Sequence, residues 1–150
     1  MEGEIQTFLP LPDFAASARV LDWRRLGKQR SETMQILRTI RGESEGWRNH
    51  PAVRMWIGYA PALINYDIDM CEEWRRRGYH DTALDYFLEH LADCPDWDDN
   101  MSPPWLGRAD FHASHRAALL AKDPAWYGQF GWSEAPAIDY IWPTTLAETV

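Results

Sequence analysis

The residues from Asp22 to Arg41 carry the clearest helical pattern in the chain. Side chains that suit a packed face recur there at the three- and four-residue spacing of one side of a helix; these are Leu26, Thr33, Ile36, Leu37 and Ile40. Gln29 and Arg30 fall within that arc, where a buried polar group must find partners. Because pattern and packing disagree at these two positions, the stretch is predicted to be a helix that contributes to a functional site.

The remaining segments also favour helices, so an all-α fold is expected. Pro10 and Pro12 hold a leader over residues 1–12 extended, and Asp13 is a good N-cap for the helix after it. Helices are predicted over 13–21, over 52–77 with a division near Pro61, and over 82–93, 108–121 and 125–130. An irregular tail is expected over 132–150. With no convincing strand and no internal repeat, the 150 residues are interpreted as one compact helical domain.

Charge is distributed unevenly along the chain. The formal net charge is −8, which by itself argues against a nucleic-acid partner. From Arg19 to Arg54, however, nine basic residues stand against four acidic ones, so this span carries +5 and the rest −13. The asymmetry indicates either a basic binding face on an acidic body or surface helices that simply carry charge.

The sequence also limits compartment, metals and cofactors. No apolar run approaches the roughly 18–20 residues that span a bilayer, and no secretory segment is evident, so a cytoplasmic monomer is expected. Cys71 and Cys94 are isolated and predicted to be reduced, buried thiols. The acidic loop at 93–99 lacks the glycine and terminal Glu of a calcium loop and is interpreted as solvated. No metal and no cofactor are expected.

Segments in chain order resemble the pyrimidine-dimer DNA glycosylases, small all-helical enzymes that cut the glycosidic bond of ultraviolet-damaged DNA. Residues 115–131, which contain Pro-Ala-Trp-Tyr-Gly-Gln-Phe-Gly, are similar to the family's last helix and the Trp-Tyr motif after it. Residues 76–79 are similar to the end of its middle helix, and 22–24 to the acid-aromatic-Arg motif of its catalytic helix. Residues 25–30 look like a divergent bacterial subgroup. The resemblance implies an all-helical fold and DNA as the partner.

The resemblance also implies a mechanism, from which the sequence departs at two positions. Family members use a newly exposed N-terminal amine, usually of Thr, to form an imine with the sugar. Here Glu2 is expected to hinder removal of Met1, and an ungapped alignment places the amine position near Glu4. The family's catalytic glutamate follows the Arg that matches Arg24, whereas this chain has Arg25 there. Excision without the amine-dependent lyase step is therefore expected.

Breaking an N-glycosidic bond develops positive charge on the sugar, so the site needs a carboxylate. Glu32 follows Lys28 by four residues, Gln29 by three and Arg25 by seven, so these side chains are expected to surround one point. The cations are expected to keep Glu32 ionised. Glu32 is thus interpreted as the catalytic carboxylate, Asp22 is the second candidate, and Arg25 and Gln29 complete the catalytic set. The alternative is an ordinary helix ion pair worth about 0.3–0.5 kcal/mol.

Other side chains are candidates for contact with nucleic acid through their charge, ring nitrogens or aromatic faces. They are Arg24, Lys28, Arg30, His50, His115, Arg116, Trp126 and Tyr127. Gln29 is a candidate reader of a base edge and Arg30 of a phosphate or carbonyl, the alternative being a buried network that pins helices together. Each histidine, His112 included, is a candidate proton carrier or a structural residue. Trp126 and Tyr127 suit stacking on a flipped base or packing in the core.

Two functions are compatible with these residues. The first is a glycosylase-like protein that excises a damaged or modified pyrimidine from DNA with Glu32 and water. The second is a non-catalytic nucleic-acid or nucleotide-binding module on the same fold. The lesion, the choice between DNA and RNA, and the role of the acidic loop at 93–99 are left open by the sequence.

Overall fold

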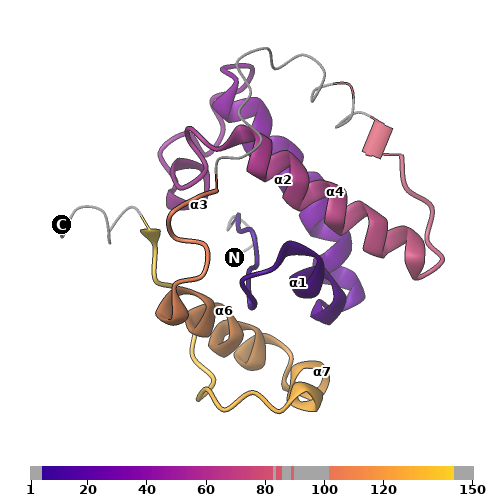
Figure 1. Cartoon of the computed structure of the whole chain (residues 1–150), viewed down its shortest axis with the longest axis vertical. Coiled ribbons are helices and arrows are strands. Elements are labelled where there is room, and N and C mark those ends of the chain that lie inside the picture. Colours follow the sequence, from indigo (N-terminus) through magenta and orange to yellow (C-terminus); the bar gives the residue numbers. More distant parts are fainter. Residues whose placement is uncertain (1–4, 83, 86–88, 90–101, 144–150) are drawn as a thin grey trace.

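The computed structural model describes residues 5–82, 84, 85, 89 and 102–143, and no strand occurs among them, so the all-α prediction is confirmed. The described part of the chain folds into helices joined by short turns and by one long irregular tail (Figure 1). The helices are α1 (Phe14–Val20), α2 (Trp23–Ile40), α3 (Pro51–Arg54), α4 (Ala60–Arg76), α6 (Ala109–Lys122), α7 (Pro124–Tyr127) and the 3-10 helix η1 (Gly128–Phe130).

Caps and prolines set the helix boundaries as the sequence indicated. The carboxylate of Asp13 accepts a hydrogen bond from the backbone N–H of Ala16 at 2.8 Å, which starts α1. Asp22 caps α2 in the same way, and that helix ends one residue before the predicted end at Arg41. The predicted helix over 52–77 is divided, with α3 ending before the turn and Pro61 standing in the first turn of α4.

Helices α2 and α4 form the main packed pair, and α1 also lies against α4 (Figure 1). Gly27 lies at the contact between α2 and α4: a Cβ atom there would come within 2.9 Å of the Trp74 indole. The glycine therefore lets the two helices approach closely.

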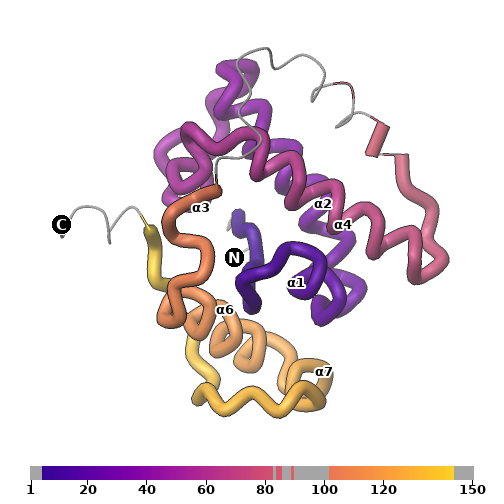
Figure 2. The backbone as a smooth tube through the Cα atoms, viewed as in Figure 1, coloured from indigo at the N-terminus to yellow at the C-terminus, as the bar shows by residue number. Residues whose placement is uncertain are grey.

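The leader does not lie on the outside of the molecule. Figure 2 shows the N-terminal segment passing between the helices, and Ile5, Phe8 and Leu9 are buried. Both backbone polar groups of Leu9 bind histidines of α6: its N–H donates to Nδ1 of His115 at 2.9 Å, and its carbonyl accepts from Nδ1 of His112 at 2.8 Å. The described part of the leader, residues 5–12, has no helix or strand and contributes to the core.

The segment 132–142 has no regular secondary structure, yet it is tied to α6. The N–H of Ala137 donates to the carbonyl of Ala117 at 3.1 Å, and the N–H of Ile141 donates to the hydroxyl of Ser114 at 3.1 Å. Trp132 stacks on Tyr127 with 5.7 Å between ring centroids. The tail therefore packs as a covering segment and brings its side chains to one side of α6.

Some expectations fall on residues that the structure does not describe, or describes only in part. The predicted helix over 82–93, the acidic loop at 93–99 and Cys94 lie wholly or mainly outside the described residues. Cys71 is a free, buried thiol, as predicted. Among the described helices, none has the length and apolar character needed to cross a membrane.

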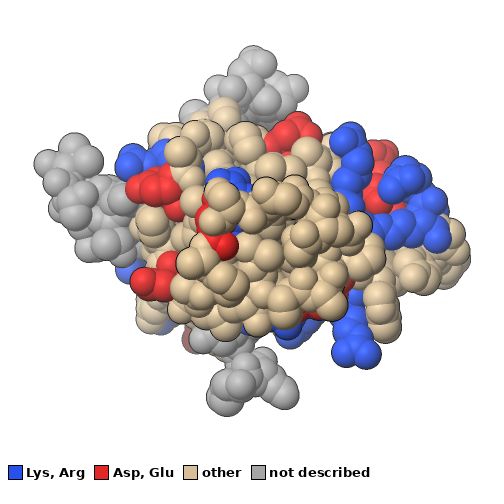
Figure 3. Space-filling view, turned by 90° about the horizontal axis from the view of Figure 1, so that it is seen from below, with Lys and Arg blue, Asp and Glu red and all other residues tan. Residues whose placement is uncertain are grey.

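Charged side chains are unevenly spread over the surface. Figure 3 shows the face seen from below, with Lys and Arg gathered toward its right-hand edge and largely uncharged side chains over its centre. Part of the positive excess of residues 19–54 is neutralised within the fold, because Arg30 pairs with Asp81, which lies outside this span. The positive excess of the span 19–54 therefore does not translate into an equally basic face.

Candidate functional site

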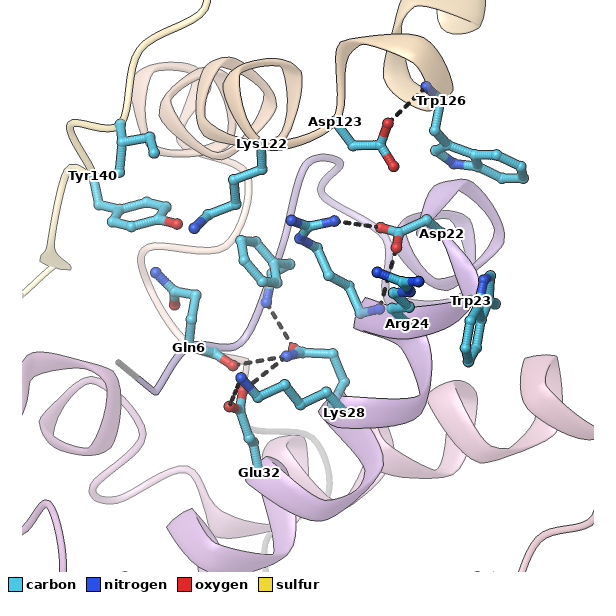
Figure 4. Close-up of a pocket in the computed structure, with 14 residues that line it drawn as sticks. Gln6, Asp22, Trp23, Arg24, Lys28, Glu32, Lys122, Asp123, Trp126 and Tyr140 are labelled. Carbon is cyan, nitrogen blue, oxygen red and sulfur yellow. Dashed lines mark hydrogen bonds and ion pairs between the residues drawn. The ribbon is translucent and has the colours of Figure 1, made fainter. Parts of the chain in front are cut away.

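An open pocket of about 820 Å³ lies where the N-terminal half of α2 faces the leader, the end of α6, α7 and the tail (Figure 4). It is lined by Gln6, Phe8, Asp22, Trp23, Arg24, Arg25, Lys28, Gln29, Glu32, Lys122, Asp123, Trp126, Ile138 and Tyr140. The volume lies within the roughly 300–1,000 Å³ range of small-molecule sites. All four residues of the predicted catalytic set contribute to this one wall of the protein.

Glu32 lies at one end of the pocket in a ring of donors. Its carboxylate accepts a hydrogen bond from Nε2 of Gln29 at 3.2 Å and one from the backbone N–H of Gln6. The ammonium of Lys28 lies 3.6 Å from Oε2, and the Glu32 side chain is 12% exposed. The predicted grouping of Glu32, Lys28 and Gln29 is thus present, but Arg25 is not part of it.

The protonation of Glu32 differs from the expectation. Burial raises the pKa of its carboxyl above the ordinary value of 4.5, although the charge of Lys28 and the hydrogen bonds of Gln6, Lys28 and Gln29 act in the opposite direction. The nearby cation Lys28 thus acts in the expected direction, but desolvation exceeds its effect and the net shift of the pKa is upward. A carboxyl with a raised pKa accepts a proton near neutral pH better than an ordinary one.

Asp22 lies at the opposite end of the pocket and is bound on every side. One carboxylate oxygen accepts from the hydroxyl of Tyr127 at 2.5 Å and from Nη1 of Arg25 at 3.0 Å. The other accepts from the backbone N–H of Arg25, which makes Asp22 the N-cap of α2. Burial raises its pKa, but the bonds of Tyr127 and Arg25 outweigh burial and hold that pKa below the ordinary value. Asp22 therefore stays ionised as an anchor of the fold.

Gln29 is central to a buried network rather than exposed to a ligand. Its Nε2 donates to the carbonyl of Gln6 at 2.9 Å and to Glu32, and its Oε1 accepts from the N–H of Phe8 at 2.9 Å. The same oxygen lies 2.6 Å from the hydroxyl of Tyr66. Both donors and both acceptor sites of the amide are used within the protein. Of the two expectations for Gln29, a reader of a base edge and a network that pins segments together, these bonds favour the network.

The rim of the pocket supplies cations and aromatic faces. Trp23 is 54% exposed and carries the guanidinium of Arg24 over its ring at 5.4 Å. Across the opening, Figure 4 shows the side chain of Lys122 extending into the pocket and the indole of Trp126 at its edge. Among the described residues, neither Arg24 nor Lys122 forms an ion pair. These two cations are available to an anionic ligand.

Arg30 and His50 were predicted to contact nucleic acid and do not line the pocket. Nε of Arg30 donates to Asp81 at 2.8 Å, and its guanidinium lies 4.7 Å from the centre of the Trp74 ring. Nδ1 of His50 accepts from the N–H of Ala52 and so caps α3. In the structure Arg30 joins α2 to the segment after α4, and His50 starts a helix, so both lie apart from the other predicted residues that line the pocket.

Three predicted contacts in the C-terminal half are structural for the same kind of reason. His115 is fully buried, and burial lowers its pKa to about 3, so it is a neutral acceptor for the N–H of Leu9. Nε and Nη2 of Arg116 both donate to Oε2 of Glu134, and its Nη1 donates to the carbonyl of Pro10. Tyr127 is fully buried, and its hydroxyl donates to Asp22.

Other lining residues were not predicted. Trp23 lies inside the segment 22–24 that carried the family resemblance, and its neighbour Arg24 offered a signal for it. Three of them lie far apart in the sequence, in the leader, at the end of α6 and in the tail; they are Gln6, Lys122 and Tyr140. They come together only in the folded protein, so no local sequence pattern marks them as pocket residues. Within the described ranges, no group of three or more His, Cys, Asp or Glu side chains is placed to hold a metal ion.

Comparison with known proteins agrees with this geometry. The family model described as pyrimidine dimer DNA glycosylase matches residues 5–87, which is more than half of the chain. The matched span contains residues 5–12 of the leader and α1 to α4, and hence Asp22 and Glu32 of the pocket. It ends before α6, so the similarity noted over 115–131 lies outside it. Neither the curated proteins nor the solved structures give a match.

The match and the helical fold lead to one conclusion. By the extent of the match, this chain belongs to the pyrimidine dimer DNA glycosylase family.

Proposed function

We propose that this protein is a DNA N-glycosylase that releases a damaged or modified pyrimidine by hydrolysis, without the amine-dependent lyase step. The observation that carries the proposal is Glu32: a largely buried carboxyl with a raised pKa that is reached from an open pocket. Perturbed carboxyls in clefts are typical of catalytic sites. Family membership supports glycosylase-like action on DNA in general.

The pocket suits a nucleotide that has left the base stack. Its rim carries the exposed rings of Trp23 and Trp126, and a flipped base or its neighbour is commonly held by such stacking. Arg24 and Lys122 stand on opposite sides of the opening, where they suit the phosphates that flank the extruded nucleotide. Charge is therefore expected to position the strand, whereas selection of the base falls to the interior of the pocket.

The chemistry follows from the position of Glu32. In the proposed step its carboxylate accepts a proton from a water molecule, and the water oxygen forms a bond to C1′ of the sugar as the bond from C1′ to the ring nitrogen breaks. The electron pair of that bond goes to the departing base, which then takes up a proton. Before attack, the negative carboxylate also stabilises the positive charge that develops on the sugar. The products are a free base and an abasic site.

A second function is favoured by one specific observation. Arg25 occupies the position of the family's catalytic acid, and its guanidinium is tied to Asp22 at 3.0 Å. A chain that has replaced that acid by a structural cation is compatible with a module that binds DNA without cutting it. In this case Glu32 and Lys28 form a helix ion pair with no role in a reaction.

The test compares wild type, Glu32→Gln and a control, Glu45→Gln, which removes an exposed carboxylate from the loop after α2. Duplex DNA carrying ultraviolet lesions or single modified pyrimidines is incubated with each protein. Free base is measured by mass spectrometry, abasic sites by alkaline cleavage and binding by fluorescence anisotropy. We expect release by wild type and Glu45→Gln and retained binding without release by Glu32→Gln. Binding without release by wild type favours the second function.

A borohydride arm tests the absence of the lyase step. Reduction during turnover traps an enzyme joined to DNA through an imine, and hydrolysis leaves nothing to trap. We expect no trapped product while base is being released. A trapped product places an amine in the reaction and overturns the hydrolytic part of the proposal.

A further inference from the structure

Gln6 has a side-chain amide whose orientation is fixed by its own neighbour. Its Oε1 accepts a hydrogen bond from the backbone N–H of Thr7 at 2.8 Å. Because an N–H must donate to an acceptor, the atom bound to Thr7 is the oxygen and not the nitrogen. Nε2 therefore points away from Thr7, and Figure 4 shows this end of Gln6 directed toward the side of the pocket that holds Tyr140 and Lys122.

That nitrogen has no hydrogen-bond partner among the described residues, although it is buried. Gln6 as a whole is only 5% exposed and lines the pocket. A buried donor without a partner costs about 1–3 kcal/mol, so native proteins rarely leave one. The arrangement is explained if an acceptor reaches Nε2 when the pocket is filled. Since an amide nitrogen can only donate, that acceptor is an oxygen or an unprotonated nitrogen of the ligand.

The backbone of the same residue is bound to the catalytic candidate. The N–H of Gln6 donates to the carboxylate of Glu32, and its carbonyl accepts from Nε2 of Gln29 at 2.9 Å. Two hydrogen bonds thus fix the backbone of Gln6 against α2, and a third, from the N–H of Thr7, fixes its side-chain amide. The side-chain donor consequently has a fixed position relative to the carboxylate.

We propose that Gln6 is the residue that recognises the departing base, by donating Nε2–H to the ring carbonyl oxygen next to the glycosidic nitrogen of a pyrimidine. This rests on the proposed function. When the bond to C1′ breaks, the electron pair that stays with the base spreads from the ring nitrogen onto this O2 oxygen. A donor placed there in a water-poor site binds the leaving group more tightly as its charge grows. Gln6 then acts on base release while Glu32 acts on the sugar.

The test is a cycle of four single-turnover rates. Wild type and Gln6→Met are each given duplex DNA with a pyrimidine that wild type releases, and the same DNA with O2 of that base replaced by sulfur, a poorer acceptor. We expect Gln6→Met to lower the rate on the oxygen substrate by about 10- to 100-fold. Sulfur should lower the wild-type rate, yet lower that of Gln6→Met much less, because the donor is already gone.

Two further variants keep the result interpretable. Gln35→Met makes the same change at an exposed position of α2 and should behave as wild type. Gln6→Glu keeps an oxygen for the N–H of Thr7 but has no donor, so it should lose the sensitivity to sulfur even if Gln6→Met unfolds. Equal sulfur effects in wild type and in the folded Gln6 variants overturn the inference while the glycosylase proposal stands. Absence of release by wild type overturns both.

Discussion

Asp22, the N-cap of α2, and Glu32 within that helix both line the pocket, and their carboxylates have opposite properties. Asp22 is held by Tyr127, by Arg25 and by the start of α2, and its pKa is lowered. Glu32 receives weaker or longer contacts from Gln29 and Lys28, and burial raises its pKa. Neighbouring titratable groups whose pKa values are driven apart often divide structural and chemical roles between them.

The difference separates a structural carboxylate from a candidate chemical one. The carboxylate oxygens of Asp22 are occupied by hydrogen bonds from groups of the protein, so they are not available to a substrate. Burial outweighs the groups that stabilise the charge of Glu32, and such a carboxyl is a candidate for a chemical role. The comparison predicts two separate defects. Replacing Glu32 should abolish base release with little change in stability, whereas replacing Asp22 should lower the free energy of unfolding.

The largest expected effect is on turnover in Glu32→Gln. The amide keeps the size of the side chain but cannot take a proton, so single-turnover base release should fall by about 10²- to 10⁴-fold. The melting temperature should stay close to that of wild type, because the lost ion pair is with a largely exposed Lys28. Full activity in this variant would falsify the assignment of Glu32 as the base.

The next effect is on stability in Asp22→Ala. This change removes the cap of α2 and leaves the buried hydroxyl of Tyr127 without its acceptor, so the free energy of unfolding should fall by about 2–4 kcal/mol. Because the pKa of Asp22 is lowered in the fold, its contribution is complete above the ordinary aspartate pKa and is lost as pH falls through the lowered value. Urea titrations near neutrality and in acid measure this. A variant as stable as wild type near neutrality contradicts the anchor role.

A smaller effect is expected on the acid limb of the rate profile. Because the pKa of Glu32 is raised, the carboxylate is lost at a higher pH than for an ordinary glutamate, and kcat/KM should decline there. Lys28→Met removes the charge that opposes this shift, so the limb should move to still higher pH. Lys122→Met removes a pocket cation that does not pair with Glu32 and should leave the limb in place. Equal limbs in wild type and Lys28→Met argue against Glu32 as the titrating group.

The smallest effect concerns the strength of DNA binding. Arg24→Met and Lys122→Met should each reduce the slope of log binding constant against log salt by about 0.9 if each contacts one phosphate of a duplex. Arg54→Met, an exposed cation of α3 outside the pocket, should leave the slope unchanged. Fluorescence anisotropy over a range of salt concentrations gives the slopes. Unchanged slopes in both rim variants remove the rim from the DNA interface.

Local signals carried the prediction of α2 and of the break between α3 and α4. Periodicity, the cap at Asp22 and Pro61 act within a few residues, so they can be read from one sequence. The spacing of Lys28, Gln29 and Glu32 likewise gave their contact, because residues three or four apart share a helix face. These features supplied one wall of the candidate site.

The remaining features depend on pairs that lie far apart in the chain. Tyr127 and His115 look like surface-capable side chains in sequence, and they are buried because Asp22 and Leu9 reach them across more than a hundred positions. The raised pKa of Glu32 has the same origin, since the desolvation comes from the whole packed environment. No sequence pattern marked Gln6 as a site residue, because the leader has no helical periodicity from which a polar residue could depart.

The hydrogen bonds of His112 and His115 with the backbone of Leu9 bear on the order of folding during translation. These contacts join residues separated by 103 and 106 positions, so Leu9 gains both of its backbone partners only when α6 exists. On a ribosome, α1, α2 and α4 emerge earlier and can pair with one another and with the leader, which Gln29 and Tyr66 bind. The pocket is also lined by Lys122, Trp126 and Tyr140, so it is completed only near the end of translation.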